Sequence, residues 1–129
     1  MSAFHDKVRK QASTRIPDFP LRLLFREVAA EEAAGERFLG LVSMTDTEIV
    51  VVTSRSVHVI KERLIGAKSR SWALADIDAV SVDQATLVLR LADGDLVGLQ
   101  FAGRADPDAP THAKNAWTAH DLIARQIDP

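Results

Sequence analysis

The sequence has no cysteine among its 129 residues. It therefore has no disulfide framework, no thiolate nucleophile and no cysteine-ligated metal site. A chain of this length can bury enough apolar surface to fold without disulfides or structural metals, so we expect a single self-sufficient domain. The lack of cysteine also fits a reducing compartment.

Strong charge of one sign and long apolar runs are missing as well. The 16 basic and 18 acidic side chains give a formal net charge of −2, which is unlike the basic surface of a nucleic-acid-binding protein. No apolar run reaches the roughly 18 residues that a membrane-spanning helix needs, and the N-terminus lacks the apolar core of a signal peptide. We therefore expect a cytoplasmic protein without a nucleic-acid partner. The bias toward alanine, arginine, aspartate and valine suggests a bacterial coding sequence.

The sequence also lacks the motifs of common catalytic and cofactor sites. The six glycines form neither a Gly-x-Ser-x-Gly nucleophile elbow nor a phosphate-binding loop. Among the four histidines, His112 and His120 are eight residues apart, about 80° around a helix, so they do not share a metal. His58 faces away from Val57 and Val59, and we expect it to be partly exposed. These features predict a protein that is not an enzyme, with no cofactor and no small-molecule substrate.

Two aspartate pairs have the right chemistry for calcium, but their spacing does not match a calcium loop. Asp93 with Asp95 and Asp106 with Asp108 lie outside any twelve-residue loop with the required ligand rhythm. Turn formation by Asp93 and helix capping by Asp108 explain these residues without a metal.

Residues 1–35 are predicted to form an N-terminal helical extension. A helix is expected over residues 20–34, capped by Asp18. Arg22 and Arg26 point away from an apolar stripe on this helix. The stripe consists of Leu21, Leu24, Phe25 and Val28. It has to pack either on its own domain or against a second copy of the chain.

From Glu36 onward the apolar residues recur with a period of two, which predicts β-strands. Strands are expected at 37–44, 48–53, 56–61, 71–74, 77–82, 86–92 and 95–101. Asp93-Gly94 between the last two strands predicts a tight hairpin, because glycine accepts a positive φ. A charged loop is expected over residues 62–69.

The last predicted element is an amphipathic helix from Thr111 to Ile127. Its apolar stripe comprises Ala113, Ala116, Trp117, His120, Ile123, Ala124 and Ile127. We expect this stripe to pack on the strands with Trp117 filling the open end of the β-fold, and Leu122 to be exposed on the opposite side. Several short strands followed by one helix predict a mainly β (β+α) sandwich or small barrel with one end closed.

Three stretches carry a resemblance to a known family. They are Gly35-Glu36-Arg37-Phe38-Leu39, Val52-Thr53-Ser54-Arg55-Ser56-Val57 and the segment from Trp72 to Val80. Together with the strand order and the tryptophan-bearing helix, they resemble the short bacterial pleckstrin-homology-like (PH-like) domains of unknown function. The resemblance covers residues 36–127. It implies a seven-stranded antiparallel barrel or sandwich capped by the C-terminal helix, as a domain of residues 36–129.

The chain departs from the family's pattern at two places. Those bacterial domains often carry an arginine where this chain has Ser56, and here the arginine stands one residue earlier, at Arg55. Phosphoinositide-binding members carry a basic loop between the first two strands, but residues 44–48 are acidic. The resemblance therefore implies the fold and not that ligand.

The sequence leaves three functions open. The first is a non-catalytic binding or scaffold module that contacts another protein or a second copy of the chain. The sheet edges and loops of a PH-like scaffold are natural docking sites, and the stripe of the N-terminal helix adds a second apolar surface. The second is a peripheral module for an anionic membrane or ligand, using the loop 61–70. Its cations are Lys61, Arg63, Lys68 and Arg70. The third is an enzyme with an unrecognised site.

Overall fold

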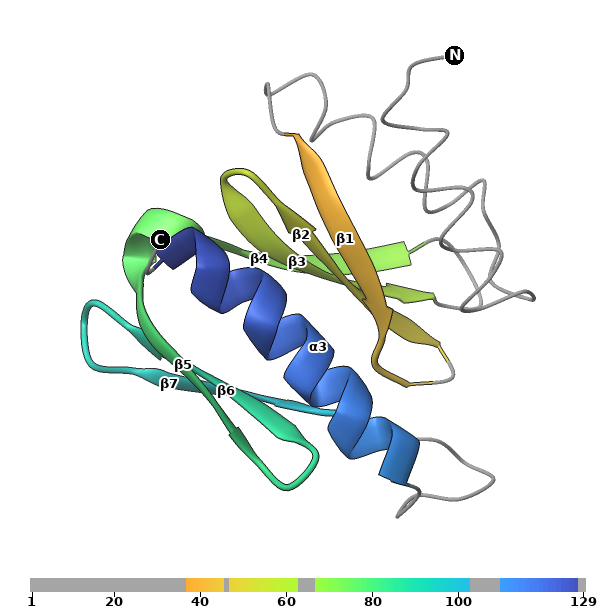
Figure 1. Cartoon of the computed structure of the whole chain (residues 1–129). Coiled ribbons are helices and arrows are strands. Elements are labelled where there is room, and N and C mark those ends of the chain that lie inside the picture. Colours follow the sequence, from red (N-terminus) through yellow and green to blue (C-terminus); the bar gives the residue numbers. More distant parts are fainter. Residues whose placement is uncertain (1–36, 46, 63–66, 103–109, 128–129) are drawn as a thin grey trace.

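The computed structural model describes residues 37–45, 47–62, 67–102 and 110–127. It is a mainly β molecule of two antiparallel sheets with a C-terminal helix lying across them (Figure 1). The first sheet contains β1 (Phe38–Ser43), β2 (Glu48–Thr53), β3 (Ser56–Glu62) and β4 (Ala67–Ala73). The second contains β5 (Ile77–Asp83), β6 (Thr86–Leu91) and β7 (Leu96–Gln100), and the helix is α3 (Pro110–Ile127). All seven predicted strands and the predicted C-terminal helix are confirmed.

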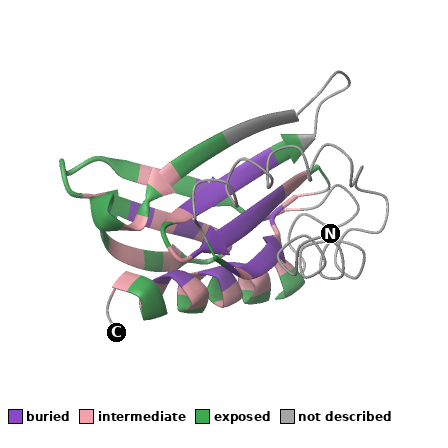
Figure 2. Ribbon diagram, turned by 90° about the horizontal axis from the view of Figure 1, so that it is seen from above, coloured by how far each residue is buried: buried purple, intermediate pink, exposed green. Residues whose placement is uncertain are grey.

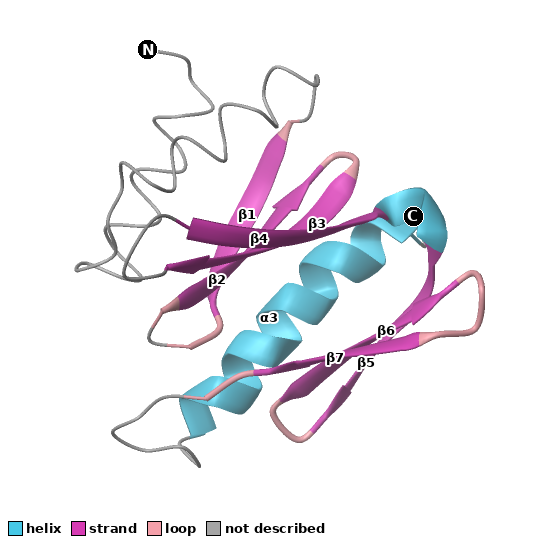
Figure 3. Ribbon diagram, turned by 180° about the vertical axis from the view of Figure 1, so that it is seen from behind, coloured by secondary structure: helices cyan, strands magenta, loops and turns pink. Residues whose placement is uncertain are grey.

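Each sheet is a meander in which neighbouring strands follow one another along the chain. Sheet A has the order β1-β2-β3-β4, and sheet B has the order β5-β6-β7. The short 3₁₀ helix η1 (Leu74–Asp76) carries the chain from one sheet to the other (Figure 3). Within the described ranges no ladder joins the two sheets. Of the two expected forms, these residues therefore adopt the open sandwich and not the closed barrel.

The boundaries of β4 differ from the prediction. The loop expected at 62–69 is shorter, because β3 continues through Glu62 and β4 begins at Ala67. The two strands stay in register over this stretch, with Lys61 opposite Lys68. The residues that lengthen this hairpin are mostly polar and show no apolar alternation, so the sequence did not indicate them as strand. Backbone hydrogen bonds between β3 and β4 extend the hairpin there. The helix predicted at 20–34 lies outside the described residues.

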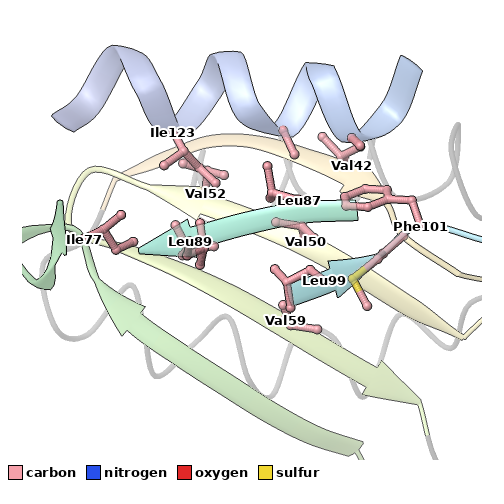
Figure 4. Packing of buried hydrophobic residues seen from close by; sticks show 14 residues of the cluster. Val42, Val50, Val52, Val59, Ile77, Leu87, Leu89, Leu99, Phe101 and Ile123 are labelled. Atoms are coloured by element: carbon pink, nitrogen blue, oxygen red, sulfur yellow. The ribbon is translucent and has the colours of Figure 1, made fainter. Parts of the chain in front are cut away.

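The core lies between the sheets and under α3. Its buried members come from every layer, as Figure 4 shows: Val42, Met44, Val50, Val52, Val57, Val59, Ile77, Leu87, Leu89, Leu99, Phe101, Ala116, Ala119 and Ile123. β-Branched residues predominate in β2 and β3, where they suit a strand that is covered on both faces. Each large member contributes about 1.5–3 kcal/mol by leaving water.

The hairpin predicted at Asp93-Gly94 is confirmed. Gly94 has a φ of 94°, a conformation that glycine adopts without steric cost. The Leu91 N–H donates to the Asp95 carbonyl at 2.8 Å, and the Asp95 N–H donates to Asp93 Oδ1 at 2.9 Å. Asp93 thus has the turn-forming role that the sequence assigned to it. Gln84, in the turn between β5 and β6, also has a positive φ, of 57°, which no feature of the sequence indicated.

The packed face of α3 is rotated from the predicted stripe, and this corrects the placement of Trp117. The buried residues of the helix are Ala116, Ala119 and Ile123, and Figure 2 shows the buried parts of the helix on its side toward the strands. Trp117 is 51 % exposed and does not fill the open end of the fold. Leu122, expected to be exposed, packs beside Gly40 of β1. Small side chains at 116 and 119 let the helix approach both sheets more closely than a buried tryptophan would allow.

A candidate binding pocket between β5 and α3

β5 forms one edge of sheet B and lies next to α3. In the described part of the chain it pairs with β6 on one side and with no strand on the other. A register shift between Ile77 and Ala79 places Asp78 at a bulge near the start of the strand. Such irregularities re-aim side chains at strand edges. The edge beside α3 therefore offers main-chain hydrogen-bonding groups and a redirected carboxylate.

A pocket of about 500 Å³ lies between this strand and the helix. Its lining consists of Asp78, Ala79 and Val80 from β5 and of His120, Ala124 and Ile127 from α3. The three helix residues follow one another at spacings of four and three, which places them in one row on the helix surface. Alanines on both walls leave the space open. We call this site the β5–α3 pocket.

Trp117 stands beside the pocket on the same side of α3. Its ring meets the His120 ring at a centroid distance of 5.0 Å and an interplanar angle of 67°, an edge-to-face arrangement that is favourable for aromatic pairs. His120 Nδ1 lies 3.0 Å from Asp121 Oδ1. The carboxylate and the indole thus hold the imidazole from two sides. The result is a half-exposed aromatic surface that continues into the pocket.

The lining of the pocket combines two polar side chains with four apolar ones. His120 and Asp78 line the same pocket, which is the combination that a general acid–base site requires. However, the lining contains no hydroxyl, thiol or amine nucleophile. In the part of the chain that the structure describes, no group of three metal-ligating side chains comes together. A pocket that combines apolar walls with two polar side chains can bind a side chain and orient it.

The predicted cation cluster is only partly within the described residues. Lys61 is exposed near the end of β3, opposite Glu48 in the β2–β3 register. Arg70 is exposed on β4, with its guanidinium carbon 5.5 Å from the centre of the Trp72 ring. Arg63 and the side chain of Lys68 lie outside the described residues. Lys61 thus has an acidic residue opposite it on the neighbouring strand, and Arg70 lies over the face of an aromatic ring.

A smaller pocket of about 290 Å³ lies near Trp72, where the chain passes from sheet A to sheet B. Its lining consists of Ser71, Trp72, Ala73, Asp76, Leu91, Ala92 and Asp93.

The interaction stripe predicted on the N-terminal helix lies outside the described residues. It consists of Leu21, Leu24, Phe25 and Val28.

Comparisons of the chain with family models, with curated proteins and with solved structures gave no match. Among the described elements, no helix combines the length and the apolar character that crossing a bilayer requires.

Proposed function

We propose that this chain is a non-catalytic protein-binding module that takes up an extended segment of a partner protein along β5. An edge strand offers a row of N–H and C=O groups to which a further strand can add. The β5–α3 pocket lies where a side chain of such an added strand would point toward α3. Main-chain pairing supplies affinity in this mode, and the pocket supplies selectivity.

The observation that carries the proposal is the exposure of Trp117 beside the pocket. Tryptophan is enriched among the residues that dominate binding energy, because one flat side chain buries a large area at little entropic cost. Here the fold holds the ring edge-on against His120 and leaves half of it open to solvent. An apolar side chain of the partner would fill the pocket and cover the indole.

The arrangement of four and three antiparallel strands followed by one helix supports a PH-like assignment, which we propose together with this function. A scaffold of this kind keeps the edge strand and the helix in a fixed relation. The pocket is therefore formed before the partner arrives, which lowers the cost of binding.

The proposal can be tested by selecting peptides from a random library on the immobilised full-length chain. We expect the selected peptides to bind Trp117→Ala at least about thirtyfold more weakly, which corresponds to a loss of about 2 kcal/mol. Leu96→Ala is the matched control, because Leu96 is 68 % exposed on β7, away from the pocket. Failure to select any peptide, or equal binding to both variants, would overturn the proposal.

A further inference from the structure

The two sheets differ in what they present on the side away from the shared core. Sheet B has an ordinary solvated face, on which Ser81, Asp83, Arg90 and Gln100 are exposed. They alternate along their strands with core residues such as Leu87 and Leu89. This pattern is typical of an antiparallel sheet that is covered on one side only.

Sheet A has a second apolar face. In β2, Val50 and Val52 belong to the core, so Ile49 and Val51 point to the other side of the sheet. The register extends this side to neighbouring strands, because directly paired residues share a face. Its members are Phe38, Leu41, Ile49, Val51, Thr53, His58 and Ile60. We call this surface the outer face of sheet A.

The outer face of sheet A is buried. Ile49, Val51 and Ile60 have no exposed area, although none of them belongs to the core cluster. His58, which the sequence led us to expect partly exposed, is also buried, with its Nδ1 2.7 Å from Ser71 Oγ. A soluble domain does not leave so large an apolar area open to water. The face is built to be covered.

Within the described ranges, the elements that pack on sheet A lie on its core side. Val42 and Val52 share a cluster with Ala119 and Ile123 of α3 and with residues of sheet B. Leu122 of α3 reaches Gly40 from the same side. The cover of the outer face therefore comes from somewhere other than α3 or sheet B.

We propose that the outer face of sheet A is the docking surface for the N-terminal segment of the same chain. The contact would be made by the apolar stripe of the helix predicted at residues 20–34. This stripe consists of Leu21, Leu24, Phe25 and Val28. The sequence predicts this apolar surface but does not show what it packs against.

The dimensions of the face match a single helix. Adjacent strands are about 4.8 Å apart, so the apolar strip from β1 to β3 is about 10 Å wide, close to the diameter of a helix with its side chains. β1 and β2 have six residues each, which corresponds to a length of about 20 Å. A helix over residues 20–34 would be about 22 Å long. One such helix covers the strip in both directions.

The attachment point favours this segment over a second copy of the chain. Phe38, at the start of β1, is paired with Thr53 and so lies on the outer face itself. Just before it, the Arg37 N–H donates to Ser54 Oγ at 2.9 Å, and the Ser54 N–H donates to the Arg37 carbonyl at 2.8 Å. The N-terminal segment thus enters at the rim of the face. A short tether gives it an effective concentration in the millimolar range, which a separate copy does not reach.

Paramagnetic broadening in the full-length chain tests the proposal, because the absence of cysteine makes a single introduced thiol unique. A spin label on Arg26→Cys, on the polar side of the predicted helix, should broaden the amide signals of β2 and β3 and spare those of β6 and β7. A label on Gln100→Cys, on the exposed face of sheet B, is the control and should give the reverse pattern. Intact β2 and β3 signals with the Arg26 label would overturn the proposal.

A mixing experiment separates the two possible occupants. Isotope-labelled chain without a spin label is mixed with unlabelled chain carrying the label at Arg26→Cys. We expect no broadening in this sample, because the contact is within one chain. Broadening of β2 and β3 in the mixture would show a second copy on the face and would contradict the proposal.

A pair of neighbouring substitutions gives an independent measurement. Phe25→Asp places a charge in the stripe and should lower the thermal midpoint of the full-length chain by about 5 °C or more. Arg26→Asp introduces the same residue on the opposite side of the predicted helix and should leave the midpoint nearly unchanged. Equal shifts for the two variants would contradict docking through the stripe. Neither result depends on peptide binding at the β5–α3 pocket.

Discussion

Gly40 and Leu122 show how closely α3 approaches β1. A Cβ atom at Gly40 would lie 2.8 Å from Leu122 Cδ1, well inside van der Waals contact. We expect Gly40→Ala to lower the free energy of unfolding by about 1 kcal/mol, because the leucine has to move. In the double variant with Leu122→Ala the clash is absent, so the two costs should not add. Urea denaturation of the four proteins measures this, and additivity within about 0.5 kcal/mol would contradict the packing.

Trp117 and Ile123 report which side of α3 carries the stability of the fold. Ile123 is fully buried and Trp117 is half exposed. Ile123→Ala should therefore cost about 2–5 kcal/mol of unfolding free energy. Trp117→Ala should cost less than about 1.5 kcal/mol, the worth of its edge-to-face contact with His120. Denaturant unfolding of both variants tests this. A larger loss of unfolding free energy in Trp117→Ala than in Ile123→Ala would show that the helix packs through the face predicted from the sequence.

Helical periodicity in the sequence could not decide which face of α3 packs on the strands. The predicted stripe and the observed face share Ala116 and Ile123, and they differ in whether Trp117 or Ala119 lies toward the strands. Hydrophobicity favours the tryptophan, whereas close packing against two sheets favours the alanine. The space between the sheets decides between them, and that space is a property of the tertiary structure.

The strands were more predictable than the site that they build. β-Branched runs and the Asp93-Gly94 turn determine their own local structure, so the strand order follows from the chain. β4 was less predictable, because its Lys, Ser and Arg residues lack apolar alternation. The β5–α3 pocket depends on which strand ends at an edge and where the helix crosses it. Its lining residues belong to a strand segment and a helix stripe that the sequence predicted, but no pattern in the sequence indicated that the two would meet at a pocket.

The hairpin of β3 and β4 was the site predicted from the sequence to bind an anionic membrane or ligand, and each of its two described cations has a neighbour within the protein. Lys61 lies opposite Glu48, and Arg70 lies over Trp72. We therefore expect the chain not to sediment with anionic vesicles at physiological salt, where surface charges more than about 8 Å apart are largely screened. The measurement is co-sedimentation at low and at physiological salt, with neutral vesicles as the control. Binding to anionic vesicles that persists at physiological salt and is lost in Arg70→Ala would favour the membrane alternative.

The described molecule shares one core among both sheets and α3, which predicts cooperative unfolding. Residues of every layer belong to one cluster, so neither sheet keeps its apolar face covered when the other is lost. In Trp117→Phe, Trp72 is the remaining tryptophan and reports on the edge of sheet A. Its fluorescence and the far-ultraviolet circular dichroism should give coincident denaturation curves. Two separate transitions would show that the sheets unfold independently.

On the scale of the whole molecule, two surfaces remain beyond the core, and they lie on different layers. The outer face of sheet A is apolar and buried, which suits a permanent contact such as the chain's own N-terminal segment. The β5 edge, with its pocket and Trp117, is accessible, which suits reversible binding of a partner. The two proposed contacts therefore lie on separate surfaces of the molecule and can be tested independently.

Addition of a partner segment to β5 should change the amide hydrogen exchange of that strand, which can be measured in the whole chain. In the presence of a selected peptide, alternate amides within Ile77–Asp83 should exchange more slowly, because every second residue of an edge strand points its N–H toward an added strand. The other edges, β1, β4 and β7, should be unchanged. Protection that appears at those edges and not at β5, or no protection at all, would show that no segment adds to β5.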